Sequence, residues 1–252
     1  MKFTRAIVFG LCFGAILTMG CEPGEEKISE IAPTDLLLAE EIMGRTIATY
    51  EECATYRDTG TVTRTFRAEE GTQRETQTFT TAFERPYRFR FECREDEKRY
   101  IIAADAAAVR AWWGVQEGIQ PMSSLDEAIA LAVGPSNGAS HTIPRLLMPG
   151  RVRGRSLEEL GNIERLTDAL LEDVPCYRLR GSDNSGAPYV VWIERGSFLV
   201  RCIDEEHAFS DFTTTDRTTY APELNPELPE NVFQLKAPVV ETGKKKMTAQ
   251  AF

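Results

Sequence analysis

Apolar and polar side chains alternate along one short stretch, residues 84 to 96, which reads ERPYRFRFECRED. Three aromatic residues and a cysteine occupy one set of alternate positions, and arginine and glutamate occupy the other. Successive side chains of a β-strand point to opposite faces of the sheet, so this pattern predicts a strand with one apolar and one wet face. The chain must therefore contain an antiparallel sheet whose apolar face is covered by another element.

The same alternation recurs before and after this stretch, with short turns between the segments. Five consecutive strands with short connections predict an antiparallel meander, and four more strands follow later in the chain. We expect turns at 182–186 and 195–196, and an irregular, proline-rich edge segment at 223–238. The predicted strands span residues 56–68, 76–85, 84–96, 98–105, 108–114, 166–182, 187–195, 196–206 and 209–222.

A helix is predicted near the N-terminus of the domain, from about Asp35 to Ala54, with Thr34 as its N-cap. Its apolar residues recur at helical spacing and should form a stripe that packs on the sheet. The stripe consists of Leu36, Met43, Ile47, Tyr50 and Ala54.

A second helix is predicted in the middle of the chain, at 123–133, where alternation stops. Ser123 or Ser124 can cap it, and Asp126 and Glu127 suit its first turn. Residues 134–150 are rich in glycine and proline and are expected to form a loop around a short apolar stretch at 143–148. Together these two pieces would cover the apolar face of the sheet, and the apolar stretch at 143–148 could contact a hydrophobic ligand. The alternative is that both pieces only close the core and contact no ligand.

The first 20 residues have the pattern of a signal peptide. Lys2 and Arg5 precede an apolar run that is too short for a membrane span. The sequence TMGC, ending at Cys21, resembles the lipobox of bacterial lipoproteins, in which the cysteine is diacylated, although Thr18 stands where leucine is usual. An ordinary secretory peptide cleaved nearby is the alternative. Glu22 favours the outer membrane, with the protein facing the periplasm.

Four segments are therefore expected along the chain: a signal peptide at 1–20, a lipidated tether at 21–34, a single domain at 35–240 and a disordered basic tail at 241–252. The net charge of the whole chain is −10. Loss of the signal peptide leaves 27 basic and 39 acidic residues, a net charge of −12. Phosphate would repel such a chain, so we exclude nucleic acid as a partner.

Cysteine usage agrees with export from the cytoplasm. Four cysteines follow Cys21, and an even number in an oxidising compartment favours disulfides. If Cys176 and Cys202 lie on strands separated by a third strand, their Cα atoms are about 9–10 Å apart, too far for a disulfide. The pairing among Cys53, Cys93, Cys176 and Cys202 stays open.

Five segments of the chain carry a resemblance to a known family: YRDTGTV, FERPYRFRFE, VPCYRLRGSD, YVVWIERGSFLVRC and LPENVFQLKAP. They resemble the LolA-like superfamily of periplasmic and outer-membrane proteins, which includes the lipoprotein carriers LolA and LolB. The likeness runs from about Pro33 to Pro238. It implies an α+β fold in which a long curved antiparallel sheet forms an unclosed β-barrel around the N-terminal helix and a helical lid. It also implies a hydrophobic cavity that takes acyl chains.

On this resemblance, the aromatic side of the opening stretch forms the cavity wall with one of two adjacent tryptophans, and the central apolar residues form the lid. The expected contacts with a hydrophobic ligand are Tyr87, Phe89, Phe91, Trp112, Trp113, Leu125, Ile129, Leu146, Leu147 and Met148. The protein would then bind a lipid or a lipoprotein acyl chain and serve in lipoprotein or lipid transport. The alternative is a packed interior and an envelope scaffold that binds a protein partner.

No catalytic centre is expected. The chain has two histidines, His141 and His207, and lacks the motifs of serine hydrolases, zinc proteases and nucleotide-binding enzymes. Ser140 precedes His141, but sequence neighbours seldom face each other as nucleophile and base. The acidic run that ends at His207, residues 204–207, is interpreted as a solvated turn after a strand. We expect neither a cofactor nor a metal.

Overall fold

The computed structural model describes residues 28–235, except 97, 115–117 and 155. The predicted signal peptide, Cys21, the first part of the tether and the tail at 241–252 lie outside the described residues. Thirteen strands of the described part form one antiparallel sheet. They are β1 (Ser29–Glu30), β2 (Thr55–Ala68), β3 (Gly71–Glu84), β4 (Arg88–Glu95), β5 (Lys98–Ala104), β6 (Val109–Trp113), β7 (Gln120–Met122), β8 (Gly161–Leu171), β9 (Val174–Ser182), β10 (Pro188–Glu194), β11 (Val200–Ala208), β12 (Phe212–Tyr220) and β13 (Glu223–Leu224).

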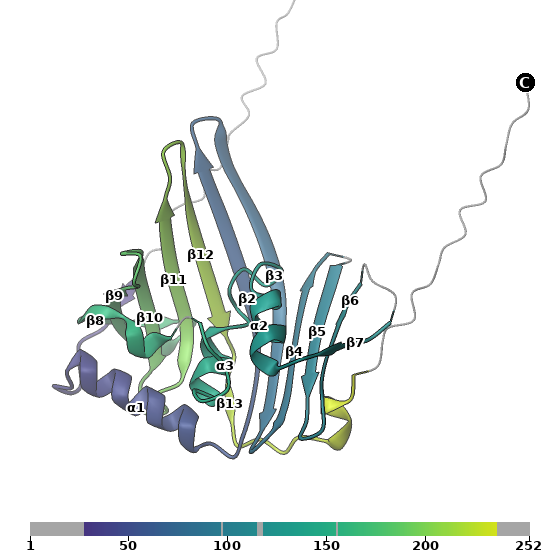
Figure 1. The fold of residues 1–252 in the computed structure, drawn as a ribbon. Helices are drawn as coiled ribbons and strands as arrows, with labels where there is room; N and C mark the ends of the chain where they lie inside the picture. Colours follow the sequence, from purple (N-terminus) through teal and green to yellow (C-terminus); the bar gives the residue numbers. More distant parts are fainter. Residues whose placement is uncertain (1–27, 97, 115–117, 155, 236–252) are drawn as a thin grey trace, which may run out of the picture.

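The sheet has the order β1-β8-β9-β10-β11-β12-β2-β3-β4-β5-β6-β7, and β13 pairs with the start of β2. Its two ends, β1 and β7, are not paired with each other, so the sheet curves without closing (Figure 1). The strands β8 to β12 and the strands β2 to β7 join where β12 pairs with β2, in a register that places Tyr220 opposite Gly60. The predicted unclosed, curved antiparallel sheet is confirmed.

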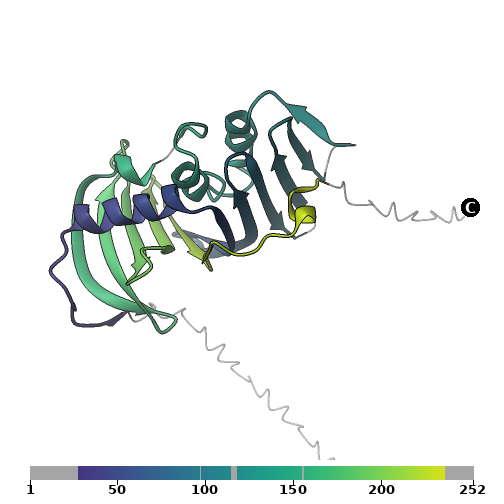
Figure 2. The ribbon, with the colours of Figure 1, turned by 90° about the horizontal axis from the view of Figure 1, so that it is seen from below.

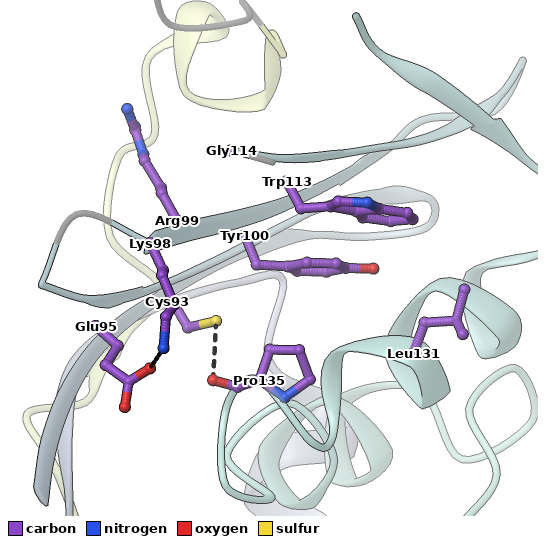
Figure 3. Close-up of a pocket in the computed structure, with 9 residues that line it drawn as sticks. All are labelled: Cys93, Glu95, Lys98, Arg99, Tyr100, Trp113, Gly114, Leu131 and Pro135. Carbon is purple, nitrogen blue, oxygen red and sulfur yellow. Dashed lines mark hydrogen bonds and ion pairs between the residues drawn. The ribbon is translucent and has the colours of Figure 1, made fainter. Parts of the chain in front are cut away.

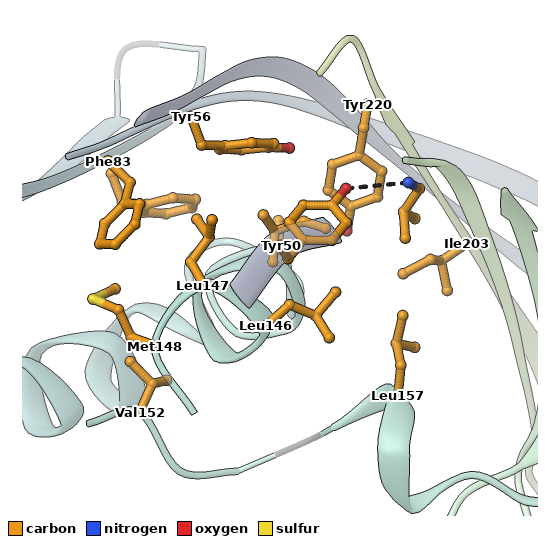
Figure 4. Close-up of a cluster of buried hydrophobic side chains, with 14 of the residues drawn as sticks. Tyr50, Tyr56, Phe83, Leu146, Leu147, Met148, Val152, Leu157, Ile203 and Tyr220 are labelled. Atoms are coloured by element: carbon orange, nitrogen blue, oxygen red, sulfur yellow. Dashed lines mark hydrogen bonds between the residues drawn. The ribbon is translucent and has the colours of Figure 1, made fainter. Parts of the chain in front are cut away.

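Three helices lie on the concave side of this sheet: α1 (Ala39–Glu52), α2 (Leu125–Ala132) and α3 (Thr142–Leu147) (Figures 1 and 2). Two short 3-10 helices follow, η1 (Leu157–Glu159) and η2 (Glu230–Phe233). Apolar side chains from the sheet and from the helices meet in one large hydrophobic core. Figure 4 shows its centre, where Tyr50 and Tyr56 lie over Leu146 and Leu147 of α3, and the Val200 N–H donates to the Tyr50 hydroxyl at 3.1 Å.

The first helix begins later than predicted, at Ala39 instead of Asp35. The carboxylate of Asp35 is held by Arg165 (2.8 Å) and by the Tyr177 hydroxyl (2.7 Å), and it also accepts from the Leu37 N–H (3.1 Å), so the chain around it forms a bend and not a helical turn. Glu41 instead accepts a hydrogen bond from the Leu38 N–H at the start of the helix. Leu36, predicted to join the apolar stripe, is 96% exposed as a consequence.

The second predicted helix is confirmed, with Ser124 as its N-cap. The Ser124 hydroxyl oxygen accepts from the Glu127 N–H at 3.1 Å, and the Glu127 carboxylate accepts from the Ser123 N–H at 3.0 Å. The loop predicted at 134–150 contains the short helix α3, which sequence reasoning missed. Pro144 lies in its first turn, where a missing N–H is tolerated.

One predicted strand, 166–182, is in fact two strands, β8 and β9, joined by a tight hairpin. The turn residues Glu172 and Asp173 both have positive φ, 48° and 67°, as a two-residue hairpin turn requires. Neither residue is the glycine or asparagine that usually marks such a turn, so the turn could not be predicted from the sequence. The short strands β1, β7 and β13 were also not predicted.

No disulfide joins any two of the four cysteines in the described residues, so the expectation of disulfides is not met. All four side chains are buried. The predicted separation of Cys176 and Cys202 by a third strand is confirmed, because β10 lies between Cys176 on β9 and Cys202 on β11. Cys53 and Cys93 belong to the main core, whereas Cys176 and Cys202 belong to a separate cluster around Trp192.

Candidate functional site

The opening stretch has the two faces that its alternation predicts, apart from its first aromatic residue. Phe89, Phe91 and Cys93 on β4 are buried in the main core, whereas Arg94 on the other face is exposed. Tyr87 is 48% exposed and precedes the strand in a turn, so its predicted place on the inner wall is wrong. Alternation assigns a face only within the strand, and β4 begins at Arg88.

The centre of the half-barrel is filled by side chains. The wall residues Phe89 and Phe91 and the lid residues are all buried and belong to one continuous cluster. The lid residues in this cluster are Leu125, Ile129, Leu146, Leu147 and Met148. The wall and the lid therefore pack against each other in the same core. At the centre of the half-barrel this agrees with the alternative of a packed interior.

An open pocket of about 670 Å³ lies beside this core, between α2 and the strands β4, β5 and β6 (Figure 3). We call it the flank pocket. Most of its surface is apolar. It is lined by Cys93, Glu95, Lys98, Arg99, Tyr100, Trp113, Gly114, Leu131 and Pro135.

A stacked pair of aromatic rings forms one wall of the flank pocket. Tyr100 and Trp113 are register partners on β5 and β6, and their rings stack with centroids 5.1 Å apart and planes within 5° (Figure 3). Opposite them lie Pro135 and the 51% exposed side chain of Leu131 on α2. The Cys93 thiol donates to the Pro135 carbonyl oxygen at 3.9 Å. Trp113 is therefore the one predicted ligand contact that lines this pocket.

Trp112 lies on the other face of β6. Its register partner is Ile101, and both are buried without belonging to the main core. Tyr100 was not predicted as a lining residue, because every residue from 100 to 104 is apolar or aromatic. Without alternation, the inner and outer faces of β5 cannot be told apart.

The charged residues at the rim of the flank pocket neutralise one another. Lys98 pairs with Glu95 at 3.0 Å, and this hydrogen bond is the main reason that the pKa of Glu95 is lowered. Arg99 holds Glu92 through two hydrogen bonds of 2.6 and 2.8 Å. Burial alone would raise the pKa of Glu92, but the bonds from its arginine partners lower it.

The polar groups inside the flank pocket are uncharged at neutral pH. Burial raises the pKa of the Cys93 thiol to about 12 and that of the Tyr100 hydroxyl to about 12. A thiol that stays protonated is a poor nucleophile and a poor metal ligand. The arrangement is therefore suited to holding an apolar group and not to covalent chemistry.

No protein-family model matches the sequence, and no curated protein matches it. Among solved structures, the lipoprotein LppX of Mycobacterium tuberculosis is similar at 9% identity, over 75% of this chain and 95% of its own, with a TM-score of 0.44. A LolA superfamily protein from Nitrosomonas europaea matches at 10% identity, over 79% of this chain and 99% of its own, with a TM-score of 0.33. A chain of the Pseudomonas aeruginosa MucA/MucB complex matches at 10% identity, over 79% of this chain and 61% of its own, with a TM-score of 0.45.

Identities this low concern the fold alone, and no ligand or partner is assigned from them. The topology of this chain is what bears on the family resemblance: one antiparallel sheet stays open between β1 and β7, with an N-terminal helix and a helical lid on its concave side. This is the unclosed antiparallel architecture that the resemblance of the sequence predicts. Within the described part of the chain, no helix is long and apolar enough to cross a bilayer.

The serine considered for catalysis is engaged in a structural hydrogen bond. The buried Ser140 hydroxyl donates to the Ile129 carbonyl oxygen at 3.3 Å. The acidic run at 204–207 lies within β11 and not in a turn, so the interpretation as a solvated turn is wrong. Its side chains alternate between the two faces, and Glu205 is buried. Among the described residues, no group of three or more histidine, cysteine, aspartate or glutamate side chains could hold a metal.

Proposed function

We propose that the protein is a non-enzymatic lipoprotein of the bacterial envelope that holds a hydrophobic ligand, the acyl chain of a lipid or of a lipoprotein, in the flank pocket. The observation that carries this proposal is the apolar, open pocket beside the stacked rings of Tyr100 and Trp113. Its volume of about 670 Å³ falls within the range of about 300–1,000 Å³ that is typical of small-molecule sites.

Burial of the chain would supply the affinity. Each methylene removed from water contributes about 0.8 kcal/mol, so part of an acyl chain is enough for micromolar binding. Among the described residues at the rim, Lys98 and Arg99 both pair with glutamates, so neither offers a free charge to a head group. The half-exposed Leu131 on α2 would close over the ligand as the free edge of the lid.

In our proposal, the N-terminal tether holds this pocket close to a membrane. Lipidation of Cys21 would anchor the chain in the outer membrane, with the domain in the periplasm, and a role in lipid or lipoprotein transport would follow. The supporting observations are the apolar leader and the TMGC sequence. We expect Cys21→Ser to move the protein from the membrane fraction to the soluble periplasmic fraction. Retention of the variant in the membrane fraction would contradict the anchor.

Ligand binding is tested by Leu131→Glu, with Leu36→Glu as a matched control. Both leucines are exposed, 51% and 96%, so neither change should unfold the domain. A carboxylate at 131 would lie in the flank pocket and should weaken binding of a fluorescent fatty acid by at least about tenfold, since it removes about 1.4 kcal/mol or more. Equal binding by the two variants, measured by titration, would refute the pocket as the site.

A second candidate function is favoured by the filled centre of the half-barrel. In that case the protein is a non-enzymatic envelope scaffold, and the flank pocket is a surface feature without a ligand. Native mass spectrometry of the chain purified from its own envelope without detergent separates the two. A stoichiometric lipid or acylated peptide supports the carrier; a clean apo mass without uptake of added fatty acid or lipopeptide supports the scaffold.

A further inference from the structure

Two long hairpins, β2–β3 and β11–β12, project beyond the helices on the side away from α1 (Figure 1). The tip of the second hairpin carries two phenylalanines that lie outside the hydrophobic core. Phe209 and Phe212 are 55% and 38% exposed, and their rings stack with centroids 4.5 Å apart. An exposed, stacked aromatic pair at the far end of a hairpin contributes little to folding, and such patches mark interaction sites.

The sheet register brings the two hairpin ends together. Phe212 pairs with Ala68 and Thr214 with Phe66, so a third phenylalanine lies beside the stacked pair. A hollow of about 760 Å³ lies between the two ends, and we call it the tip hollow. It is lined by Phe66, Ala68, Glu69, Glu70, Gly71, Thr72, Gln73, Ser210, Asp211 and Phe212.

The charges around the tip hollow are all negative. Glu69, Glu70 and Asp211 line it, and no lysine or arginine of the described residues does. Arg64 lies 6.0 Å from the Phe66 ring, but Asp216 holds its guanidinium through two hydrogen bonds of 2.7 and 2.5 Å.

Two other arginines of the β2–β3 hairpin, Arg67 and Arg74, lie on the opposite face of the sheet, because Arg74 pairs with Thr65 and both Thr65 and Arg67 alternate with Phe66. Arg67 donates to the Thr215 hydroxyl at 2.9 Å and lies one position from Phe66, so its side chain leaves the other face of β2. The hairpin ends thus present aromatic rings and carboxylates together, and the cations that could neutralise them are already bound or point away.

We propose that the tip hollow binds a basic segment of a partner protein. A lysine or arginine side chain can lie over an exposed phenylalanine ring while its charge meets the carboxylates at the rim. A membrane surface fits less well, because anionic lipids would repel Glu69, Glu70 and Asp211. This site is on other elements than the flank pocket, and it does not depend on whether that pocket takes a ligand.

The test uses the mature chain, residues 21–252 with Cys21→Ser, and fluorescein-labelled octalysine as the probe. Fluorescence anisotropy gives its affinity at low salt. The Phe209→Ala/Phe212→Ala variant keeps the net charge, so a fivefold or greater loss of affinity would be due to the rings. The Glu69→Gln/Glu70→Gln variant keeps the rings and should lose at least as much.

Two control variants remove comparable groups elsewhere. Glu51→Gln/Glu52→Gln removes two exposed carboxylates from the end of α1, and Tyr87→Ala removes an exposed ring. Both should bind octalysine within twofold of the parent. Unchanged binding by the Phe209→Ala/Phe212→Ala variant, or an equal loss in the controls, would overturn the proposal. So would binding to phosphatidylcholine vesicles that this double variant abolishes, since the hairpin ends would then be a membrane contact.

Discussion

Asp58 is a carboxyl group on the apolar face of β2, and its ionisation should make the stability of the fold depend on pH. The group is buried; it accepts hydrogen bonds from the Tyr56 hydroxyl (2.8 Å) and from the Thr81 N–H (2.9 Å). Burial is the largest influence and favours the neutral acid. It raises the pKa from 3.8 to about 6, although both hydrogen bonds act in the opposite direction.

The sign of the effect follows from the protons bound by each state. Between these two pKa values the folded protein keeps a proton on Asp58 that the unfolded chain has released. Stability from this group is therefore complete at low pH and is lost as the pH rises through about 6. A rise in pKa from 3.8 to about 6 corresponds to about 3 kcal/mol.

The variant Asp58→Asn removes this titration and keeps the shape of the side chain. We expect it to be close to neutral at pH 4 and to stabilise the fold by up to about 3 kcal/mol at pH 7. Urea unfolding of both proteins, followed by circular dichroism at pH 4, 5, 6 and 7, measures the difference, in which other titrating groups cancel. A difference that stays constant with pH, or that grows towards low pH, would refute the reasoning.

Three further changes test the packing described above. Phe89→Asp buries an unpaired charge in place of a core ring and should cost more than 4 kcal/mol in urea unfolding, whereas Arg94→Asp on the exposed face should cost less than about 1 kcal/mol; equal losses would contradict the two faces of β4. Ser124→Ala removes the cap of α2 and should cost about 1 kcal/mol, and an unchanged midpoint would show that the cap is dispensable. Gly60→Ala would press a methyl group against both the Phe79 ring and the backbone carbonyl oxygen of Thr219, so we expect a cost of at least about 1–3 kcal/mol, and a neutral result would mean that the ring and the β12 backbone both move aside.

For Arg90 the structure leads to a different expectation from alternation alone. Alternation places Arg90 on the wet face of β4, which predicts that a charge reversal there is nearly neutral. In the structure Arg90 pairs with Glu92 at 2.9 Å and donates to the Gln234 carbonyl oxygen at 3.2 Å. Arg90→Asp would place two carboxylates together, and it should destabilise the fold measurably. Arg94 is the better control, because its side chain is more than half exposed and its own ion pair with Glu92 is longer, at 3.5 Å.

Some parts of the candidate site were accessible from the sequence and others were not. The strand β4 alternates cleanly, so its buried side could be named as far as Phe89 and Phe91. The strand β5 is apolar on both sides, and only the fold shows that Tyr100 faces the flank pocket while Ile101 does not. The exposed place of Tyr87 was missed for a different reason, since the strand begins one residue later.

Local sequence signals were enough to predict most of the secondary structure and the class of the fold. Alternation and turn residues are local signals, and they specified the antiparallel meander, the capped helix α2 and an apolar face that needs a cover. The positions of the pockets, in contrast, follow from tertiary packing. Whether Leu146, Leu147 and Met148 line a cavity or fill it depends on how closely the lid packs against a curved sheet, and that distance is set by side chains far apart in the chain. The same holds for the tip hollow, which exists because pairing between β2 and β12 brings two distant turns side by side.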